Sequence, residues 1–195
     1  MKAYYDARAR EYDDWWLGRG LYGDRHRPGW EVARADLESW IGQLPPARML
    51  DVACGTGFMT RHLRGDVVGV DQSEGMLDVG RVQAPNAIFV RGDALDLPFE
   101  DAAFDRLFTS YFYCHLEEDE RARFLAEARR VARELVVVAS VSGQGDPLER
   151  WEERRLQDGS RWQVYKRVFA PEDLAEELDG RVLHANEYFV MVAAP

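Results

Sequence analysis

Residues 50–57 read Leu50-Asp51-Val52-Ala53-Cys54-Gly55-Thr56-Gly57 and join two segments of different character. Arg48–Ala53 contains an apolar run that predicts a short buried strand, and Phe58–Leu63 has the pattern of a helix start. Glycine permits a tight turn between them and a close approach of a ligand, and the following helix points free N–H groups at that space. The junction therefore predicts a ligand-binding turn, although a tight turn without a ligand has the same pattern.

Outward from this junction, short apolar runs alternate with helical segments as far as residue 141. Such alternation is typical of an α/β fold, in which right-handed crossovers build an open, doubly wound parallel sheet covered on both faces. The further expected strands are Asp66–Asp71, Ala87–Arg91, Phe104–Ser110 and Leu135–Val141, and the expected helices are Ser73–Val82, capped by Ser73, and Asp119–Arg130.

The two ends of the chain depart from this alternation. Residues 1–17 are rich in aromatic side chains at helical spacing and predict one helix, followed by a polar loop over 18–29 and a helix over 30–42. In the last third, Asp158-Gly159 between two strand-like segments indicates a hairpin. The expected elements there are strands Leu148–Gln157 and Ser160–Phe169, a short helix Pro171–Leu178, and an antiparallel pair Val182–Ala185 and Tyr188–Val192.

Composition limits the classes of function. The chain has 195 residues, 46% of them hydrophobic, and a formal net charge of −10, which predicts one globular domain with no electrostatic affinity for nucleic acid or for an anionic membrane. The two cysteines, Cys54 and Cys114, predict neither a disulfide framework nor a metal site, and we expect a reducing, cytoplasmic location. No stretch approaches the ~18 consecutive apolar residues of a membrane span.

Two further acidic residues follow the next two expected strands. Asp71 ends the second strand, where a carboxylate can accept hydrogen bonds from a ribose diol, and Asp93 follows the third, where it can accept from an exocyclic amine. Singly, Asp71 could cap the helix near Ser73 and Asp93 could be an ordinary loop residue. The third glycine of a dinucleotide-binding Gly-x-Gly-x-x-Gly falls at Thr60, and Asp51 would repel a pyrophosphate, so the pattern disfavours NAD.

With these residues in place, the sequence resembles the class I S-adenosylmethionine-dependent methyltransferases, near the small-molecule subgroup that includes ubiquinone and menaquinone methylases. The matching segments are Asp51–Gly57, Val68–Met76, Gly92–Phe99 and Phe104–Leu116, with Tyr4-Tyr5-Asp6 and Tyr12-Asp13 at the N-terminus. The resemblance implies a Rossmann-like, mostly parallel sheet of seven strands, with the last strand antiparallel and inserted between the fifth and sixth. It implies one domain over 1–195: a helical lid (1–45), a cofactor-binding core (46–142), and a hairpin with C-terminal strands on the substrate side (143–195).

The resemblance also implies which residues contact S-adenosylmethionine. Cys54 stands near a position where the family often has glycine, a mild departure from the pattern. The methionine part is expected near Asp51, Ala53, Cys54, Gly55, Gly57 and Thr60, the adenosine part near Asp71, Gln72, Met76, Asp93 and Ala94, and the sulfonium near Ser110.

The implied reaction is an in-line methyl transfer to an oxygen, carbon or nitrogen of a small molecule, with S-adenosylhomocysteine as product. His115 is the first candidate for a base and His26 the second, although a histidine in either place can be purely structural. The expected substrate pocket has aromatic walls, while the basic residues of the hairpin either form a solvated face or pair with an anionic substrate. The pocket residues are Tyr5, Tyr12, Trp16, Tyr111 and Trp162, and the basic residues are Arg154, Arg155, Arg161, Lys166 and Arg167.

Thr109-Ser110-Tyr111-Phe112 lacks the Asn/Asp-Pro-Pro-Tyr motif of methylases that act on nucleic-acid bases or glutamine, which excludes that substrate class. Two other functions stay open at this point: an NAD(P)-dependent oxidoreductase and a non-catalytic S-adenosylmethionine-binding regulator. The expected assembly is a monomer or a homodimer.

Overall fold

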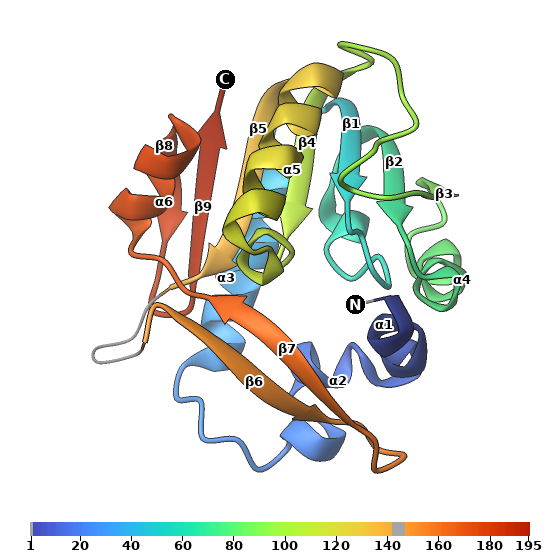
Figure 1. Cartoon of the computed structure of the whole chain (residues 1–195), viewed down its shortest axis with the longest axis vertical. Helices are drawn as coiled ribbons and strands as arrows, with labels where there is room; N and C mark the ends of the chain where they lie inside the picture. Colours follow the sequence, from blue (N-terminus) through green and yellow to red (C-terminus); the bar gives the residue numbers. More distant parts are fainter. Residues whose placement is uncertain (1, 142–146) are drawn as a thin grey trace.

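The computed structural model describes residues 2–141 and 147–195. Within them, a seven-stranded sheet has the order β3-β2-β1-β4-β5-β9-β8 (Figure 1). The strands are β1 (Ala47–Val52), β2 (Gly65–Asp71), β3 (Ile88–Arg91), β4 (Phe104–Ser110), β5 (Ala132–Ser140), β8 (Arg181–Ala185) and β9 (Phe189–Ala194).

The order of the strands confirms the predicted topology. β1 pairs in parallel with β2 on one side and with β4 on the other. β2 and β3 are therefore added on one side of β1, and β4 and β5 on the other. β9 runs antiparallel to both of its neighbours, β5 and β8, and is thus the inserted last strand. Every residue of β9 is buried, because a strand between two others with both faces covered has no solvent side.

Helices cover both faces of the sheet. α5 (Glu118–Val131) lies in front of it and α3 (Trp30–Gln43) behind it in Figure 1, and α4 (Glu74–Gln83) and α6 (Pro171–Leu178) also pack on the sheet. Their starts follow the sequence: the Ser73 hydroxyl accepts from the Met76 N–H at 3.2 Å, and Pro171 occupies the first turn of α6. The core lies on the two sheet faces, and among its fully buried side chains are Leu37, Ile41, Leu107, Phe108 and Phe124.

The N-terminal segment differs from the prediction of one helix over 1–17. It forms α1 (Lys2–Arg8), a 3-10 turn (Ala9–Glu11) and α2 (Asp14–Leu17), and a further 3-10 turn spans Gly20–Tyr22. The reason is tertiary: the Glu11 carboxylate accepts from the Gln157 N–H at 2.9 Å, and Trp16 turns into the core, which a straight helix would not allow.

The expected helix start at Phe58–Leu63 is likewise reduced to a 3-10 turn, Thr60–His62. The chain has to enter β2 at Gly65, so no room is left for further helical turns. Another such turn, Tyr113–His115, follows β4.

A separate two-stranded ribbon, β6 (Glu149–Arg155) and β7 (Arg161–Arg167), confirms the hairpin predicted around Asp158-Gly159. In Figure 1 this ribbon, α1 and α2 all lie at the edge where β1, β2 and β4 end. Strands β8 and β9 belong to the main sheet, so within 143–195 it is the ribbon that lies near this edge. Among the described residues, no helix has the length and apolar character needed to cross a bilayer.

Candidate functional site

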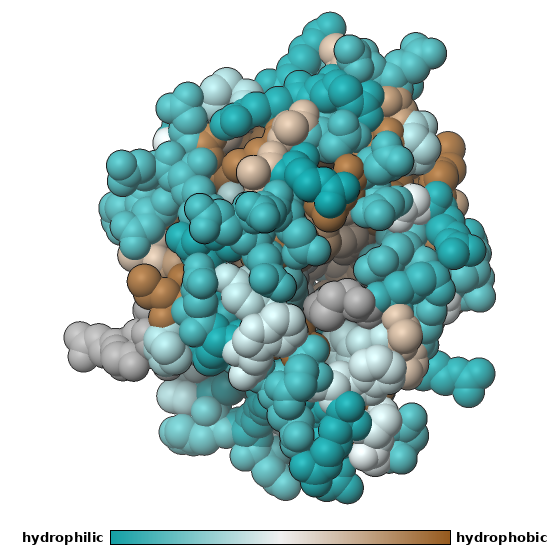
Figure 2. Space-filling view, in the orientation of Figure 1, coloured by the Kyte–Doolittle hydropathy of each residue, from teal (hydrophilic) through white to brown (hydrophobic). Residues whose placement is uncertain are grey.

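A cavity of about 230 Å³ opens at the carboxyl ends of the parallel strands, where ligands bind in open α/β sheets. Figure 2 shows a mostly hydrophilic face with a recess near its centre whose floor is hydrophobic. The residues that line the cavity come from the loops after β1, β2, β3 and β4 and from the N-terminal segment. They are Tyr5, Tyr12, Ala53, Gly55, Val70, Asp71, Gln72, Met76, Gly92, Asp93, Ala94, Leu95, Ser110, Tyr111, Phe112, His115, Leu116 and Glu120.

The backbone at the cavity wall has an unusual conformation. Ala53 and Tyr111 have φ values of +56° and +59°, which residues other than glycine rarely adopt. Gly55, at φ +55°, completes the turn after β1. Strain of this kind concentrates at functional sites, and here it occurs after β1 and again after β4.

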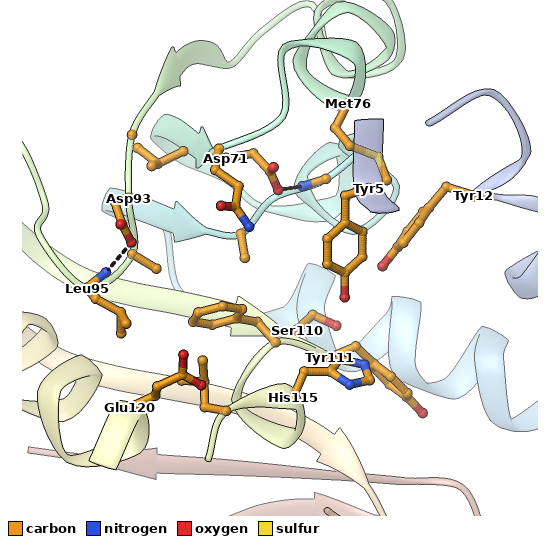
Figure 3. A pocket seen from close by; sticks show the side chains of 18 residues that line it. Tyr5, Tyr12, Asp71, Met76, Asp93, Leu95, Ser110, Tyr111, His115 and Glu120 are labelled. Atoms are coloured by element: carbon orange, nitrogen blue, oxygen red, sulfur yellow. Dashed lines mark hydrogen bonds between the residues drawn. The ribbon is translucent and has the colours of Figure 1, made fainter. Parts of the chain in front are cut away.

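The Asp71 carboxylate connects the loops after β1 and β2 by hydrogen bonds. Its Oδ2 accepts from the Gly55 N–H at 3.0 Å and its Oδ1 from the Ser73 N–H at 2.9 Å, as Figure 3 shows in part. Burial raises the pKa of this carboxyl, while the backbone N–H groups oppose the rise. A carboxylate has about four lone-pair sites, so Asp71 can serve the loop and still accept from a ligand.

Asp93 lies beyond the end of β3 and is exposed. Its Oδ1 accepts from the Leu95 N–H at 2.9 Å, which is the local turn that the sequence also allowed. In Figure 3, Asp93 and Glu120 lie on one side of the cavity and Tyr5 and Tyr12 on the other.

The Ser110 hydroxyl is the clearest indication that the cavity binds a polar group. Its Oγ is buried, lines the cavity and has no hydrogen-bond partner among the described residues. A buried hydroxyl without a partner is rare and costly, so Ser110 is positioned to bond a group that occupies the cavity.

His115 has a defined tautomer. Its Nδ1 lies 2.7 Å from the carbonyl oxygen of Tyr165, and because a carbonyl only accepts, Nδ1 carries the proton. Burial, together with the smaller effects of the Lys166 and Arg154 charges, lowers the pKa of His115 to about 4. The ring is therefore neutral near pH 7, and Nε2 is a hydrogen-bond acceptor.

Three tyrosines enclose the space around His115. Figure 3 shows the rings of Tyr5 and Tyr12 extending toward His115 and Tyr111 from the opposite wall. Burial raises the pKa of Tyr5, of Tyr12 and of Tyr111, so all three phenols stay protonated and can donate. The N-terminal segment thus closes one side of the cavity.

Several predicted cofactor residues do not line the cavity. Asp51 is 2% exposed and its Oδ2 accepts from the Thr60 hydroxyl at 2.6 Å, so these two residues bind each other beneath the loop. Burial raises the pKa of Asp51 to about 7. A Cβ on Gly57 would lie 3.2 Å from Gly80 Cα, which makes Gly57 a residue of packing against α4, and Cys54 also lies outside the lining.

Two predicted substrate aromatics are elsewhere too. Trp16 is 2% exposed and stacks on Phe58 in the core. Trp162 lies on the ribbon, where it packs against Tyr4 of α1 and donates to the Ser160 hydroxyl at 3.0 Å. Helical spacing alone does not separate an aromatic side chain that packs in the core from one that faces a ligand.

The sequence analysis missed six lining residues. Most are direct neighbours of predicted ones, and Glu120 is part of the capping box of α5, where nothing in its sequence context indicates a ligand. The missed residues are Val70, Gly92, Leu95, Phe112, Leu116 and Glu120.

Known proteins match both the loops and the whole fold. A family model described as a methyltransferase domain matches residues 50–138. A demethylmenaquinone methyltransferase of Renibacterium salmoninarum is 41% identical over 96 residues, which are 48% of this chain and 40% of that protein. The solved DhpI-SAM-HEP complex is 25% identical, covers 99% of this chain and 95% of its own, and has a TM-score of 0.77. The DhpI-SAH complex is 26% identical over 98% of this chain and 92% of its own, with a TM-score of 0.72.

Residues 50–138, a little under half of the chain, are thus similar to a methyltransferase domain, and the whole fold is similar to the two DhpI complexes. These similarities support the predicted class I S-adenosylmethionine-dependent methyltransferase family and confirm the predicted fold class. The match covers 40% of the Renibacterium protein, and a Thermotoga maritima relative, 33% identical over 98 residues (48% of this chain), is covered over 42%, so the chain matches less than half of these curated relatives. The region of the chain that the family model matches contains Asp71, Asp93, Ser110 and His115 but not Tyr5.

Proposed function

We propose that the protein transfers a methyl group from S-adenosylmethionine to a small-molecule acceptor and releases S-adenosylhomocysteine. The observation that carries this proposal is the buried Ser110 hydroxyl, which has no hydrogen-bond partner among the described residues and lies in a cavity that Asp71 and Asp93 also line. The residues present therefore fit a ligand that has hydroxyl and amino donors at one end and a reacting group at the other.

When bound, the cofactor supplies an electrophilic methyl carbon on a sulfonium, and its departure as a neutral thioether needs no acid. Asp71 would accept from the ribose hydroxyls, Asp93 and the Ala94 N–H would meet the adenine, and Ser110 would lie toward the sulfonium. Tyr5 and Tyr12 would exclude water from this space. Orientation of reactants can contribute ~7–11 kcal/mol in favourable cases, so holding and aligning is the main task of these residues.

His115 would act on the acceptor. Its Nε2 carries a lone pair because Nδ1 holds the proton, and His115 lines the same cavity as Tyr5 and Tyr111 (Figure 3). A pKa of about 4 makes the imidazole a weak base near pH 7. We therefore propose that His115 orients the acceptor by accepting its hydrogen bond, and that it is not a strong general base.

Calorimetric titration with S-adenosylmethionine and S-adenosylhomocysteine tests the cofactor site. We expect Ser110→Ala to weaken binding roughly 2- to 12-fold, the range for one neutral hydrogen bond, without loss of stability, because the Ser110 hydroxyl has no hydrogen-bond partner among the described residues. The matched control is Ser39→Ala on the exposed face of α3, which should bind as the unchanged protein does. No binding by the unchanged protein, or equal binding by Ser110→Ala, would contradict the proposal.

Turnover needs its own measurement, because a regulator would also bind the cofactor. Transfer of tritiated methyl groups into fractionated metabolites would identify acceptors, and tight binding without any labelled product would favour a non-catalytic role. A titration with NADH that gave binding would favour the oxidoreductase instead.

We further propose that the protein works in the cytoplasm, as a monomer or homodimer, without binding nucleic acid. The supporting observations are the net charge of −10 and the two free cysteines. Size-exclusion chromatography with light scattering tests the assembly, and a gel-shift assay at low salt tests the absence of nucleic-acid binding.

A further inference from the structure

A second, smaller cavity adjoins the first. Its volume is about 30 Å³, room for a small polar group. The two cavities share Tyr5, Tyr12, Tyr111 and His115, so a single molecule can extend from one into the other. The other four lining residues are Trp15 and three cationic side chains, Arg8, Arg154 and Lys166.

Arg8 is a buried guanidinium without a carboxylate partner among the described residues. It is 8% exposed, its Nη1 donates to the Tyr4 hydroxyl at 3.0 Å, and its Nε is buried with no hydrogen-bond partner. Its Cζ lies 4.6 Å from the centre of the Tyr12 ring, so aromatic faces hold it in place. A guanidinium cannot lose its proton in a protein, so Arg8 brings a full positive charge to this cavity.

Arg154 and Lys166 come from the two strands of the ribbon. The Arg154 side chain is 11% exposed and is ion-paired with Glu152, but its Nε is also buried and has no hydrogen-bond partner in the part of the chain that the structure describes. Lys166 is half-buried and has neither a hydrogen bond nor an ion pair within the described part of the chain. The one carboxylate paired with this group, Glu152, also pairs with Arg150, so positive charge is in excess.

Strand alternation explains which basic residues of the hairpin face inward. In β6 the even-numbered residues are half-buried and the odd-numbered ones exposed, as expected of a ribbon with one covered face. Arg154 lies on the covered face, whereas Arg161 pairs with Glu153 at 2.7 Å on the exposed one. Of the five basic residues in the sequence prediction, Arg154 and Lys166 line the cavity, while Arg155, Arg161 and Arg167 do not.

We propose that this cavity binds the acid group of the methyl acceptor, which is therefore a small organic oxyanion such as a carboxylate or a phosphonate. The proposal rests on the proposed methyltransferase function, because it names the substrate class of that site. Charges are excluded from protein interiors unless they are paired, and an anion would partner the two orphaned Nε–H groups and the Lys166 ammonium at once. With the acid group held there, the rest of the acceptor extends past His115 into the cavity that Ser110 lines.

The test measures binding of three small aromatic probes to protein saturated with S-adenosylhomocysteine. Benzoate and phenylphosphonate carry an oxyanion on an aromatic ring, and benzamide is the neutral counterpart of benzoate. Lys166→Met is the main variant, because Lys166 has no described partner whose loss would unfold the protein. Arg154→Gln is the second variant, and Arg161→Gln is the control that removes one positive charge from the exposed face of the same ribbon.

We expect at least one of the two anions to bind about 10-fold or more tightly than benzamide. Lys166→Met and Arg154→Gln should each weaken that anion by about 10- to 100-fold, the range for a hydrogen bond to a charged group, and Arg161→Gln should leave it unchanged. Which anion binds more tightly identifies the acid as a carboxylate or a phosphonate.

Equal binding of benzamide, no binding of either anion, or an equal loss in Arg161→Gln would overturn the proposal. Tighter binding of a neutral hydroquinone than of both anions would overturn it too. Each variant is first titrated with S-adenosylhomocysteine alone, so that failure of the cofactor site, which would contradict the proposed function, is seen separately from failure of the anion site.

Discussion

Replacing Asp51 with asparagine should stabilise the protein at alkaline pH and leave its stability nearly unchanged in acid. Asp51 is 2% exposed, and burial raises its pKa from 3.8 to about 7. The folded protein therefore holds a proton on Asp51 over a pH range in which the unfolded chain has lost it. Stability that depends on this proton is fully present below pH 4 and is lost as the pH rises through 7.

The size of the effect follows from the two pKa values. The difference between 3.8 and about 7 corresponds to roughly 4 kcal/mol, an upper figure for a buried group. Asparagine keeps an oxygen that can accept from the Thr60 hydroxyl. Its amide is neutral at every pH, as the protonated Asp51 carboxyl is. The advantage of Asp51→Asn over the unchanged protein should grow by roughly 3 kcal/mol between pH 5 and pH 8, or about 10 °C in melting temperature.

Urea unfolding at pH 5, 6, 7 and 8 measures this difference directly. Asp66→Asn, an exposed carboxylate at the start of the neighbouring strand β2, is the control for general charge effects. A stability difference between Asp51→Asn and the unchanged protein that does not vary with pH would refute the reasoning, because the Asp51 carboxyl would then ionise equally in the folded and unfolded states.

Three further predictions test the packing roles of Trp16 and Gly57 and the protonation state of His115. Trp16→Ala should lose about 3–5 kcal/mol of unfolding free energy in urea, because Trp16 fills the core; a loss below 1 kcal/mol would contradict that placement. Gly57→Ala should lose about 1–3 kcal/mol, since its Cβ would lie 3.2 Å from Gly80 Cα at φ +73°, whereas Gly159→Ala, with φ +86° and no atom within 4 Å, should lose only about 1 kcal/mol. In ¹⁵N NMR spectra of the imidazole rings, His115 should remain a neutral Nδ1–H tautomer from pH 8 to pH 5.5, and a midpoint near 6.5 would show that its burial has been misjudged.

The sheet could be predicted because its strands are buried on both faces. Continuous apolar runs such as Val67–Val70 have few other structures available, and the alternation with helices then determines a parallel order. The antiparallel final strands came from the family resemblance and a turn around Asn186, where the Phe189 N–H donates to the Asn186 side chain at 2.9 Å. The break of the N-terminal helix was not predictable, because it depends on a contact between Glu11 and Gln157, 146 residues apart.

The candidate site was predicted best where backbone geometry requires a residue type. Gly55 and Asp71 are joined by a hydrogen bond between two strand ends, and both were expected at the cavity. Asp51 was expected there too, but its carboxylate accepts from the Thr60 hydroxyl. The sequence alone does not tell whether a carboxylate near the end of a strand faces a ligand or another side chain. The local sequence gives the type of side chain at a position. The direction in which that side chain points depends on partners that only the fold brings together.

The residues expected to bind the cofactor and those expected to bind the acceptor lie in different parts of the chain. The residues matched by the family model end at 138, and they include Asp71 and Ser110. Arg8, Arg154 and Lys166 all lie outside that region, on the N-terminal segment and the ribbon. If the cations select the acceptor, then similarity to a methyltransferase domain within 50–138 predicts the methyl donor and does not identify the acceptor. Grafting the described ribbon residues 149–167 onto a relative with a neutral acceptor should then transfer anion binding only if Arg8 is moved as well, because the cavity needs both walls.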